Sequence, residues 1–333
     1  PKSPQIMEKG MPDLPKLTAS IVIPNKNSIK CEIVFSNYIE IADVNIAPSK
    51  GNLYRDVNPD DIPFTYNNVY QQNEWYPNKL VDISEPYIIR DTRGIVISAY
   101  PFQYNPVKKV LRIYYSLTVK VFEIEDENAI NELSNSSIRQ NEDFNYLYKH
   151  HFLNYSTKKY TPLKERGRIL VIAYDEYAPY MQDYVNWKNQ IGFPTEIVLT
   201  SEIGQTSAKI KEFVQNYYNK YNDFTYLLLV GDNQHIAAFP NSSGLTGPSD
   251  ANYSYLAGND HYPDVYVGRF SAESIKDVQT QVQRTIEYER AYNFEEDWLN
   301  KGLGVARYEG AGQGHNGEAD CEHIDLIREK LLN

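Results

Sequence analysis

The pattern of apolar residues changes near residue 160, and this change constrains the fold more than any other feature of the chain. Before it, short runs of β-branched and aromatic residues are separated by turn-forming Pro, Asn and Gly, which is typical of antiparallel strands. After it, short apolar runs alternate repeatedly with stretches of helical period, which is typical of a parallel sheet covered by helices. A single all-β or all-helical domain is therefore excluded.

The chain accordingly divides into three parts. Residues 1–122 are predicted to form an antiparallel β-sandwich. Residues 123–159 are acidic and then rich in Asn and Ser, which indicates a linker with one short helix, and His150 and His151 within it are expected to be solvated. Residues 160–333 are predicted to form an α/β domain with a mainly parallel sheet. Its strands are expected at 169–172, 195–199, 226–230, 265–267 and 302–306, with the last two helices at 272–292 and 318–332.

Composition excludes several classes of protein. Hydrophobic residues make up 41% of the chain and charged residues 23%, so it is neither disordered nor fibrous. The 44 acidic residues against 33 basic ones give a net charge of −11, which argues against nucleic acid as a partner. No apolar run approaches the roughly 18 residues of a membrane span. The 29 tyrosines suit half-buried sheets and wet surfaces and favour an exported protein.

Three carboxylates lie in loops beside the predicted parallel strands. Asp232 follows the strand at 226–230, and Asp260 and Asp264 precede the strand at 265–267. Function in open parallel sheets collects at the carboxyl ends of strands, and calcium is bound by six to eight carboxylate and carbonyl oxygens. A calcium site is one interpretation. The spacing alone leaves open the other, that these residues are helix caps and turn formers.

A glycine-rich loop at 309–318 contains the literal pattern G-x-G-x-x-G. In dinucleotide-binding proteins the first glycine of this motif directly follows a strand, and an acidic residue comes about 20 residues later. Here the first glycine lies six positions after Ala306, and the acidic residue would fall beyond Asn333. The pattern therefore favours a surface loop over a nucleotide site.

No complete nucleophile–base pair can be assembled from the cysteines and histidines. Cys321 and His323 are two residues apart on a predicted helix, so their side chains point to nearly opposite sides. Cys31 lies in an alternating strand and is interpreted as a small buried hydrophobe. His235 and His261 have no neighbouring nitrogen or sulfur ligands, which argues against zinc.

A series of short motifs nevertheless follows in a fixed order from residue 160 onward. They are Tyr160-Thr161-Pro162, VNWKNQ at 185–190, TYLLLVGD at 225–232, GNDHY at 258–262, VGRFS at 267–271, RTIEYER at 284–290 and NGEAD at 316–320. Together they resemble the catalytic domain of the gingipains, a family of secreted bacterial cysteine endopeptidases with a caspase-like fold, and the arginine-specific members more than the lysine-specific one. The first 159 residues, with GMPDLP at 10–15 and YPFQYNP at 100–106, resemble the family's β-rich propeptide.

The resemblance implies a propeptide followed by the first half of a peptidase. The family's catalytic histidine lies in a Gly-His-Gly motif and its cysteine in an Ala-Cys motif, and neither motif occurs before Asn333. The chain alone is therefore expected to be inactive and to need the remaining half of the catalytic domain as a partner. Substrates would be proteins or peptides, and the protein would be secreted or held on the outer-membrane surface of a bacterium.

Individual residues also receive roles from the resemblance. Glu309 matches the acidic residue that orients the catalytic histidine. Asp320 matches the carboxylate at the base of the specificity pocket, where an arginine guanidinium would bind in bidentate fashion. The family carries Glu where this chain has Asp264. The calcium site implied by the resemblance comprises Asp232, Asp260 and Asp264 with the carbonyls of Ala257 and Tyr262.

The propeptide is expected to control the peptidase, by its removal on activation and by inhibition before that. Cleavage is predicted between Lys159 and Tyr160, in a polar stretch whose backbone can enter a protease cleft. The family carries Arg before this bond. Arg90 and Arg93 flank a turn between two predicted strands, and they are the candidates for a basic side chain that occupies the pocket ending at Asp320.

Two other interpretations stay open. One is a surface protein with the gingipain fold but without protease output, such as a sortase-like transferase or an inactive paralogue. The other is a β-sandwich joined to an α/β binding module with no chemistry. The sequence beyond Asn333 discriminates among them, because Gly-His-Gly followed by Ala-Cys supports the peptidase, a lost cysteine supports the first alternative and a stop codon supports the second.

Overall fold

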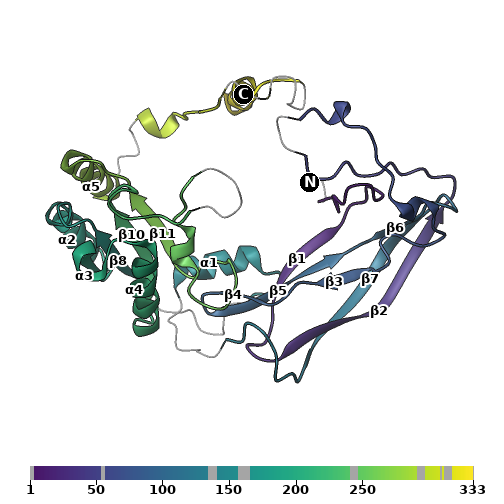
Figure 1. Cartoon of the computed structure of the whole chain (residues 1–333), viewed down its shortest axis with the longest axis horizontal. Coiled ribbons are helices and arrows are strands. Elements are labelled where there is room, and N and C mark those ends of the chain that lie inside the picture. The colour runs from purple at the N-terminus through teal and green to yellow at the C-terminus, as the bar shows by residue number, and fades with distance from the viewer. Residues whose placement is uncertain are drawn as a thin grey trace.

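The computed structural model describes residues 4–53, 57–133, 141–156, 166–240, 247–290, 297–307, 310 and 317–332. Figure 1 shows a β-rich N-terminal unit beside an α/β unit. The strands are β1 (Leu17–Val22), β2 (Ser28–Ile41), β3 (Val81–Ile83), β4 (Tyr87–Ile89), β5 (Thr92–Ala99), β6 (Phe102–Asn105), β7 (Val110–Ile124), β8 (Arg168–Ala173), β9 (Thr195–Leu199), β10 (Phe224–Val230) and β11 (Tyr266–Phe270). The α-helices are α1 (Glu142–His151), α2 (Gln182–Gln190), α3 (Thr200–Ile203), α4 (Ser207–Lys220), α5 (Ile275–Arg290) and α6 (Asp320–Leu332). Short 3₁₀ helices are η1 (Pro59–Asp61), η2 (Asn68–Gln71), η3 (Ala178–Met181), η4 (Ala251–Ser254) and η5 (Asp297–Asn300).

The N-terminal unit is built from two antiparallel sheets, as predicted. In one, β5 lies between β1 and β3 and also pairs with β4, and in the other the order is β2-β7-β6. β2 and β7 form a long ribbon whose pairing is irregular at two places, Val34 of β2 and Tyr115 of β7. The ends of the predicted strands differ from the observed ones by a few residues, because pairing extends several strands beyond their β-branched runs.

Helix α1 is the one short helix expected within residues 123–159, but it is packed against the N-terminal unit rather than solvated. Phe144, Tyr148 and Phe152 recur every fourth residue and form one apolar stripe. The stripe is buried against Tyr87 and Ile89 of β4. Burial of these rings attaches α1 to the N-terminal unit.

The two adjacent histidines of α1 lie in different environments. His150 is exposed, as expected. His151 is half-buried, its Nε2 lies 2.8 Å from the Tyr87 hydroxyl, and burial lowers its pKa. The expectation of a solvated side chain is therefore wrong for His151, because α1 turns it toward β4.

The α/β unit contains a wholly parallel four-stranded sheet in the order β11-β10-β8-β9. Leu170 and Ile172 of β8 pack on the side of α4, while Val171 and Ala173 pack on the side of α2 and α5. Figure 1 shows the helices on both faces. A continuous apolar strand covered on both faces is what the sequence of β8 predicted, and the predicted fold class is confirmed.

The strand expected at 302–306 is absent from the structure. Leu303 and Val305 are 91% and 81% exposed, and the segment pairs with no described strand. It runs beside α6 instead, where a side chain at Gly304 would clash with Ile324. A short apolar run after a predicted helix suggested a strand, but without a neighbouring strand the segment does not form one.

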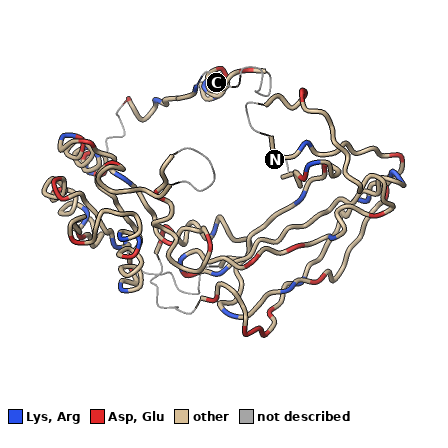
Figure 2. Tube along the Cα trace, viewed as in Figure 1, with Lys and Arg blue, Asp and Glu red and all other residues tan. Residues whose placement is uncertain are grey.

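Charged residues of both signs are distributed over the described residues. Figure 2 shows Lys and Arg interspersed with Asp and Glu along both units. None of the helices in the described ranges combines the length and apolar character that a membrane crossing requires.

Candidate active-site edge

The strand order of the parallel sheet reverses between β8 and β10. From β8 the chain passes to β9 on one side, and then crosses over to β10 and β11 on the other. Ligands of such sheets bind outside the carboxyl ends of the strands at this reversal. The loops after Ala173 and Val230 therefore form the candidate active-site edge.

Asp175 occupies this edge just after β8. It accepts hydrogen bonds from the Thr200 hydroxyl at 2.7 Å and the Ser201 N–H at 3.0 Å, and also from the Ser201 hydroxyl. The bond from the Ser201 hydroxyl contributes most, followed by that from Thr200, and together these bonds lower the pKa of Asp175. The Asp175 carboxylate holds the start of α3 against β8. In the sequence, the only sign of this role is that Asp175 follows an apolar strand.

Asp232 lies at the same edge, past the end of β10. Its N–H donates to the Ala272 carbonyl at 3.0 Å, and its Oδ1 accepts from the Ser271 hydroxyl at 3.2 Å. Close by, Arg269 donates to both carboxylate oxygens of Asp250 at 2.8 and 2.7 Å. These contacts connect the ends of β10 and β11 and fix the shape of the edge, and sequence reasoning missed the Arg269–Asp250 pair.

His235 is a half-buried imidazole at this edge. Its ring lies 4.6 Å from that of Tyr174 and 5.1 Å from that of Tyr177, whose hydroxyl is 3.4 Å from Nε2. Within the described residues its Nδ1 is buried without a hydrogen-bond partner. Gly231, with φ of +136°, lies so near that a Cβ there would come within 2.9 Å of the His235 Cβ. The imidazole thus lies among aromatic rings, and no metal-ligand cluster forms around it within the part of the chain that the structure describes.

Asp260 and Asp264 lie at the other end of the sheet. Asp264 is fully buried, and its Oδ2 accepts from the N–H groups of Leu256 and Ala257, each at 2.7 Å. Burial raises its pKa to about 7, despite the opposing effect of these hydrogen bonds. Asp260 accepts from the N–H of Tyr262 at 2.9 Å. Both carboxylates are therefore engaged by backbone donors.

The five residues expected to bind calcium do not form one site in this structure. Asp264 precedes β11 by two residues, whereas Asp232 follows β10 by two, so about eight residues at roughly 3.3 Å each separate them along the paired strands. Parallel neighbouring strands require the chain to return to its starting end, which carries the loop away from Asp232. Ala257 and Tyr262 turn their N–H groups toward the carboxylates. Across the described ranges, no three acidic, His or Cys side chains gather closely enough to hold a metal ion.

In this structure Arg90 and Arg93 do not lie in a pocket at Asp320. Both arginines are buried, at 1% and 0% exposure. The Arg93 guanidinium donates to four carbonyls inside the N-terminal unit, and that of Arg90 donates to the Phe224 carbonyl at 2.6 Å. Figure 1 shows the yellow helix α6, which begins at Asp320, well away from β4 and β5. A sequence reveals a basic residue at a turn but not the carbonyl groups that surround it.

The other predicted site residues can be placed only in part. Asp320 is half-buried at the start of α6, beside a Glu318–His323 pair with an Oε1–Nδ1 distance of 2.7 Å. Glu309, Lys159 and Tyr160 lie outside the described residues. Their roles, and that of Asp320, stay predictions.

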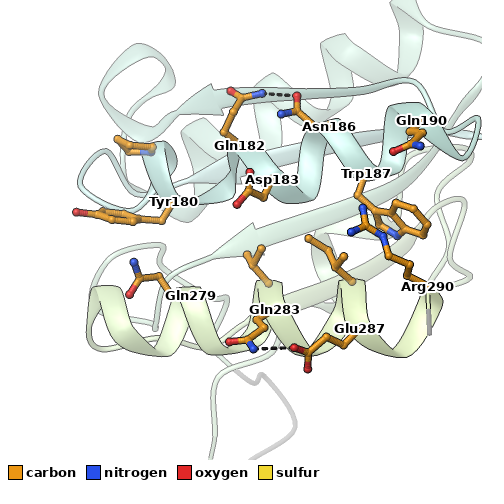
Figure 3. A pocket seen from close by; sticks show the side chains of 13 residues that line it. Tyr180, Gln182, Asp183, Asn186, Trp187, Gln190, Gln279, Gln283, Glu287 and Arg290 are labelled. Atoms are coloured by element: carbon orange, nitrogen blue, oxygen red, sulfur yellow. Dashed lines mark hydrogen bonds between the residues drawn. The ribbon is translucent and has the colours of Figure 1, made fainter. Parts of the chain in front are cut away.

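A groove of about 860 Å³ lies between α2 and α5 on the outer face of the helices. Figure 3 shows amide side chains from the two helices lining it, with a Gln182–Asn186 hydrogen bond on α2. Arg290 stacks on Trp187 at 4.7 Å, and the Trp187 Nε1 donates to Glu289 at 2.8 Å. None of the residues that line the groove is a Cys, Ser or Thr that could act as a nucleophile, so the groove is not the candidate active site.

The fold and the candidate active-site edge together define the class of this protein. It is an α/β protein that carries a β-rich N-terminal unit docked on its parallel sheet. The chain belongs to peptidase family C25, whose model matches residues 163–331. A model described as the C25 propeptide matches residues 1–161.

Curated relatives come from Porphyromonas gingivalis. Gingipain R2 of strain W83 is 42% identical, over 98% of this chain and 44% of that protein. Gingipain R1 is 41% identical, over 98% of this chain and 33% of that protein. Lys-gingipain is 25% identical, over 90% of this chain and 18% of that protein. The chain thus spans less than half the length of these relatives.

Two solved structures are also similar. The complex of the Porphyromonas gingivalis RgpB pro- and mature domains is 41% identical, with a TM-score of 0.42, over 46% of this chain and 76% of that chain. The Arg-specific cysteine proteinase gingipain R is 42% identical, with a TM-score of 0.43, over 52% of this chain and 40% of that chain.

Proposed function

We propose that the whole protein is the zymogen of a secreted cysteine endopeptidase that cleaves after arginine. This chain supplies the propeptide and the first half of the peptidase unit. The observation that carries the proposal is the order of the two family matches, propeptide and then peptidase, in a chain more than 40% identical to arginine gingipains over 98% of its length.

Within this proposal the substrate and catalytic groups are divided between this chain and the residues after it. Asp320 binds the arginine guanidinium of the substrate, because a bidentate carboxylate pair distinguishes guanidinium from ammonium. Glu309 orients the catalytic histidine and stabilises its imidazolium form. The catalytic histidine and cysteine lie beyond Asn333, and activation cuts between Lys159 and Tyr160.

Hydrolysis of peptidyl-arginine and peptidyl-lysine amides tests the proposal. The protein extended beyond Asn333 should hydrolyse the arginyl amide after activation, whereas residues 1–333 alone should hydrolyse neither. Asp320→Asn should lower kcat/KM for arginine on the order of 100-fold, while the matched control Asp325→Asn on the same helix should not. Hydrolysis by residues 1–333 would refute the division of the site, and an extended protein without any activity would favour the inactive surface paralogue.

Calcium binding and secretion are proposals of the same kind. The five residues assigned to calcium do not converge, so any calcium effect must use another set or a rearranged loop. Melting the chain in calcium and in chelator tests this. If calcium raises the melting temperature and Asp232→Ala removes that increase, the five-residue assignment is restored. Equal melting in both conditions counts against calcium in this chain. Detection of the protein in culture medium or on intact cells tests secretion.

A further inference from the structure

Arg90 has a backbone conformation that arginine rarely adopts. It occupies the first of the two turn positions between the paired residues Ile89 and Thr92, and its φ is +53°. Two-residue hairpin turns with positive φ at this position favour glycine, because a Cβ makes the conformation costly. Strain of this kind persists only where surrounding contacts maintain it, and such positions cluster at functional sites.

The contacts that maintain it come from the peptidase unit. One Arg90 terminal nitrogen donates to the carbonyls of Phe224 at 2.6 Å and Asp264 at 3.1 Å. The other lies 3.5 Å from the Asn222 carbonyl and 3.4 Å from the Thr225 hydroxyl. These four oxygens form what we call the Arg90 socket. Three of them belong to residues 222–225, which follow the carboxyl end of α4, where the helix dipole favours a cation.

The remaining faces of Arg90 are covered from both units. The Phe144 ring of α1 lies 5.0 Å from the guanidinium, on the N-terminal side. The Tyr218 hydroxyl of α4 donates to the Arg90 carbonyl at 3.3 Å. The Arg90 N–H donates to Asp264 Oδ1 at 2.6 Å. Water is thus excluded from a charged group, which makes its hydrogen bonds to the socket strong and their loss costly.

The free edge of β4 extends this contact. The N–H of Ile88 in β4, like that of Arg90 just after this strand, points outward, and it donates to Asp260 Oδ2 at 2.8 Å. The rings of Tyr87 and Tyr262 stack at 4.0 Å. Two carboxylates and a ring of the 257–264 loop therefore complete the edge of a strand that belongs to the other unit.

We infer that Arg90 anchors the propeptide on the peptidase unit, through the Arg90 socket at the amino ends of β10 and β11. The candidate active-site edge lies at the opposite, carboxyl ends of the strands. Attachment of the propeptide is therefore separate from any contact with the substrate pocket. It follows that the propeptide stays bound after the linker is cut, until the Arg90 contacts are lost.

Binding between the two halves of a cut chain tests the inference. A site for a specific protease is inserted between Lys159 and Tyr160 in the full chain, the chain is cut, and the dissociation constant is measured by size exclusion over a dilution series. Arg90→Gly removes the guanidinium, relieves the strained φ and keeps the N–H. It should weaken binding on the order of 100-fold. Lys109→Gly is the matched control, because Lys109 is an exposed basic turn residue with φ of +52°, and it should leave binding unchanged.

The outcomes are decisive in either direction. The inference is overturned if the dissociation constant of Arg90→Gly lies within about threefold of that of the unmodified chain. It is also overturned if Lys109→Gly weakens binding as much as Arg90→Gly does. If Arg90→Gly does not fold, as judged by circular dichroism of the uncut chain, Arg90→Lys replaces it. One ammonium cannot reach all four oxygens, so Arg90→Lys should weaken binding at least about tenfold, and unchanged binding again overturns the inference. No hydrolysis is measured, so a failure of the proposed peptidase activity is distinguishable from this result.

Discussion

Asp264 should make the stability of the chain fall as pH rises from 5 to 8. It is an acid whose pKa burial raises from 3.8 to about 7 in the folded state. A raised pKa means that the folded state binds the proton more tightly than the unfolded state does. The stabilisation is therefore complete below pH 3.8 and is lost as pH rises through 7.

The size of the effect follows from this difference. Each pKa unit corresponds to about 1.36 kcal/mol, and the part of the titration between pH 5 and 8 amounts to about 2 to 3 kcal/mol of unfolding free energy. The charged groups that face Asp264 are Arg90, Asp260 and Lys211. Burial also lowers the pKa of Lys211, to about 8, so its own titration lies at the upper end of this range.

Urea unfolding of the chain and of Asp264→Asn, measured at several pH values, isolates the contribution. The free-energy difference between the two proteins should change by that amount between pH 5 and 8, with the unmodified chain losing stability relative to the variant. Asp277→Asn is the control, because hydrogen bonds from Ser274 lower the pKa of Asp277 and keep it ionised throughout. Parallel pH curves for the unmodified chain and Asp264→Asn would refute the reasoning.

Two further predictions concern the core and the candidate edge. Leu229→Ala removes a fully buried side chain between β10 and α4 and should lower the unfolding free energy by about 2–5 kcal/mol in urea; a loss below about 1 kcal/mol would show that the site collapses freely. Gly231→Ala places a Cβ against His235 at a positive φ and should cost about 1–3 kcal/mol. Thermal melting followed by circular dichroism measures this, and an unchanged melting temperature would contradict it.

The sequence predicts those parts of the fold that local pattern determines. β8 is a continuous apolar run, and a strand buried on both faces follows from it directly. The stripe of Ile210, Val214 and Tyr217 likewise predicts the face of α4 that packs on the sheet. Helix α1 escaped prediction as a packed element because its three apolar rings are dispersed in a polar stretch.

The sequence predicted which residues of the candidate site lie near strand ends and turns, but not which of them come together in space. Asp232 was placed correctly after a strand, but spacing along the chain does not say that Asp264 returns to the opposite end. Arg90 and Arg93 were correctly found beside a turn, yet their partners are backbone carbonyls, which every residue carries and no sequence distinguishes. The segment at 302–306 is a short apolar run, but the sequence does not show that no described strand lies beside it to pair with.

The two irregularities in the β2–β7 ribbon compensate for each other. Val34 is an extra residue in β2 and Tyr115 is an extra residue in β7, so the one-residue offset that the first introduces is cancelled by the second. The pairing of Glu32 with Lys120 before the bulges therefore has its counterpart in Glu40 opposite Arg112 beyond them.

The extra residue of each bulge has no cross-strand partner of its own. Deletion of Tyr115 alone would therefore leave the pairs on both sides unchanged, and Glu40 would still face Arg112. If β7 kept Tyr115 but continued past it without a bulge, Glu40 would face Ile113 instead, and every residue of β2 beyond Asn37 would have a shifted cross-strand partner. The register of this ribbon thus tolerates the loss of either bulge residue, but not the loss of one bulge with its extra residue retained.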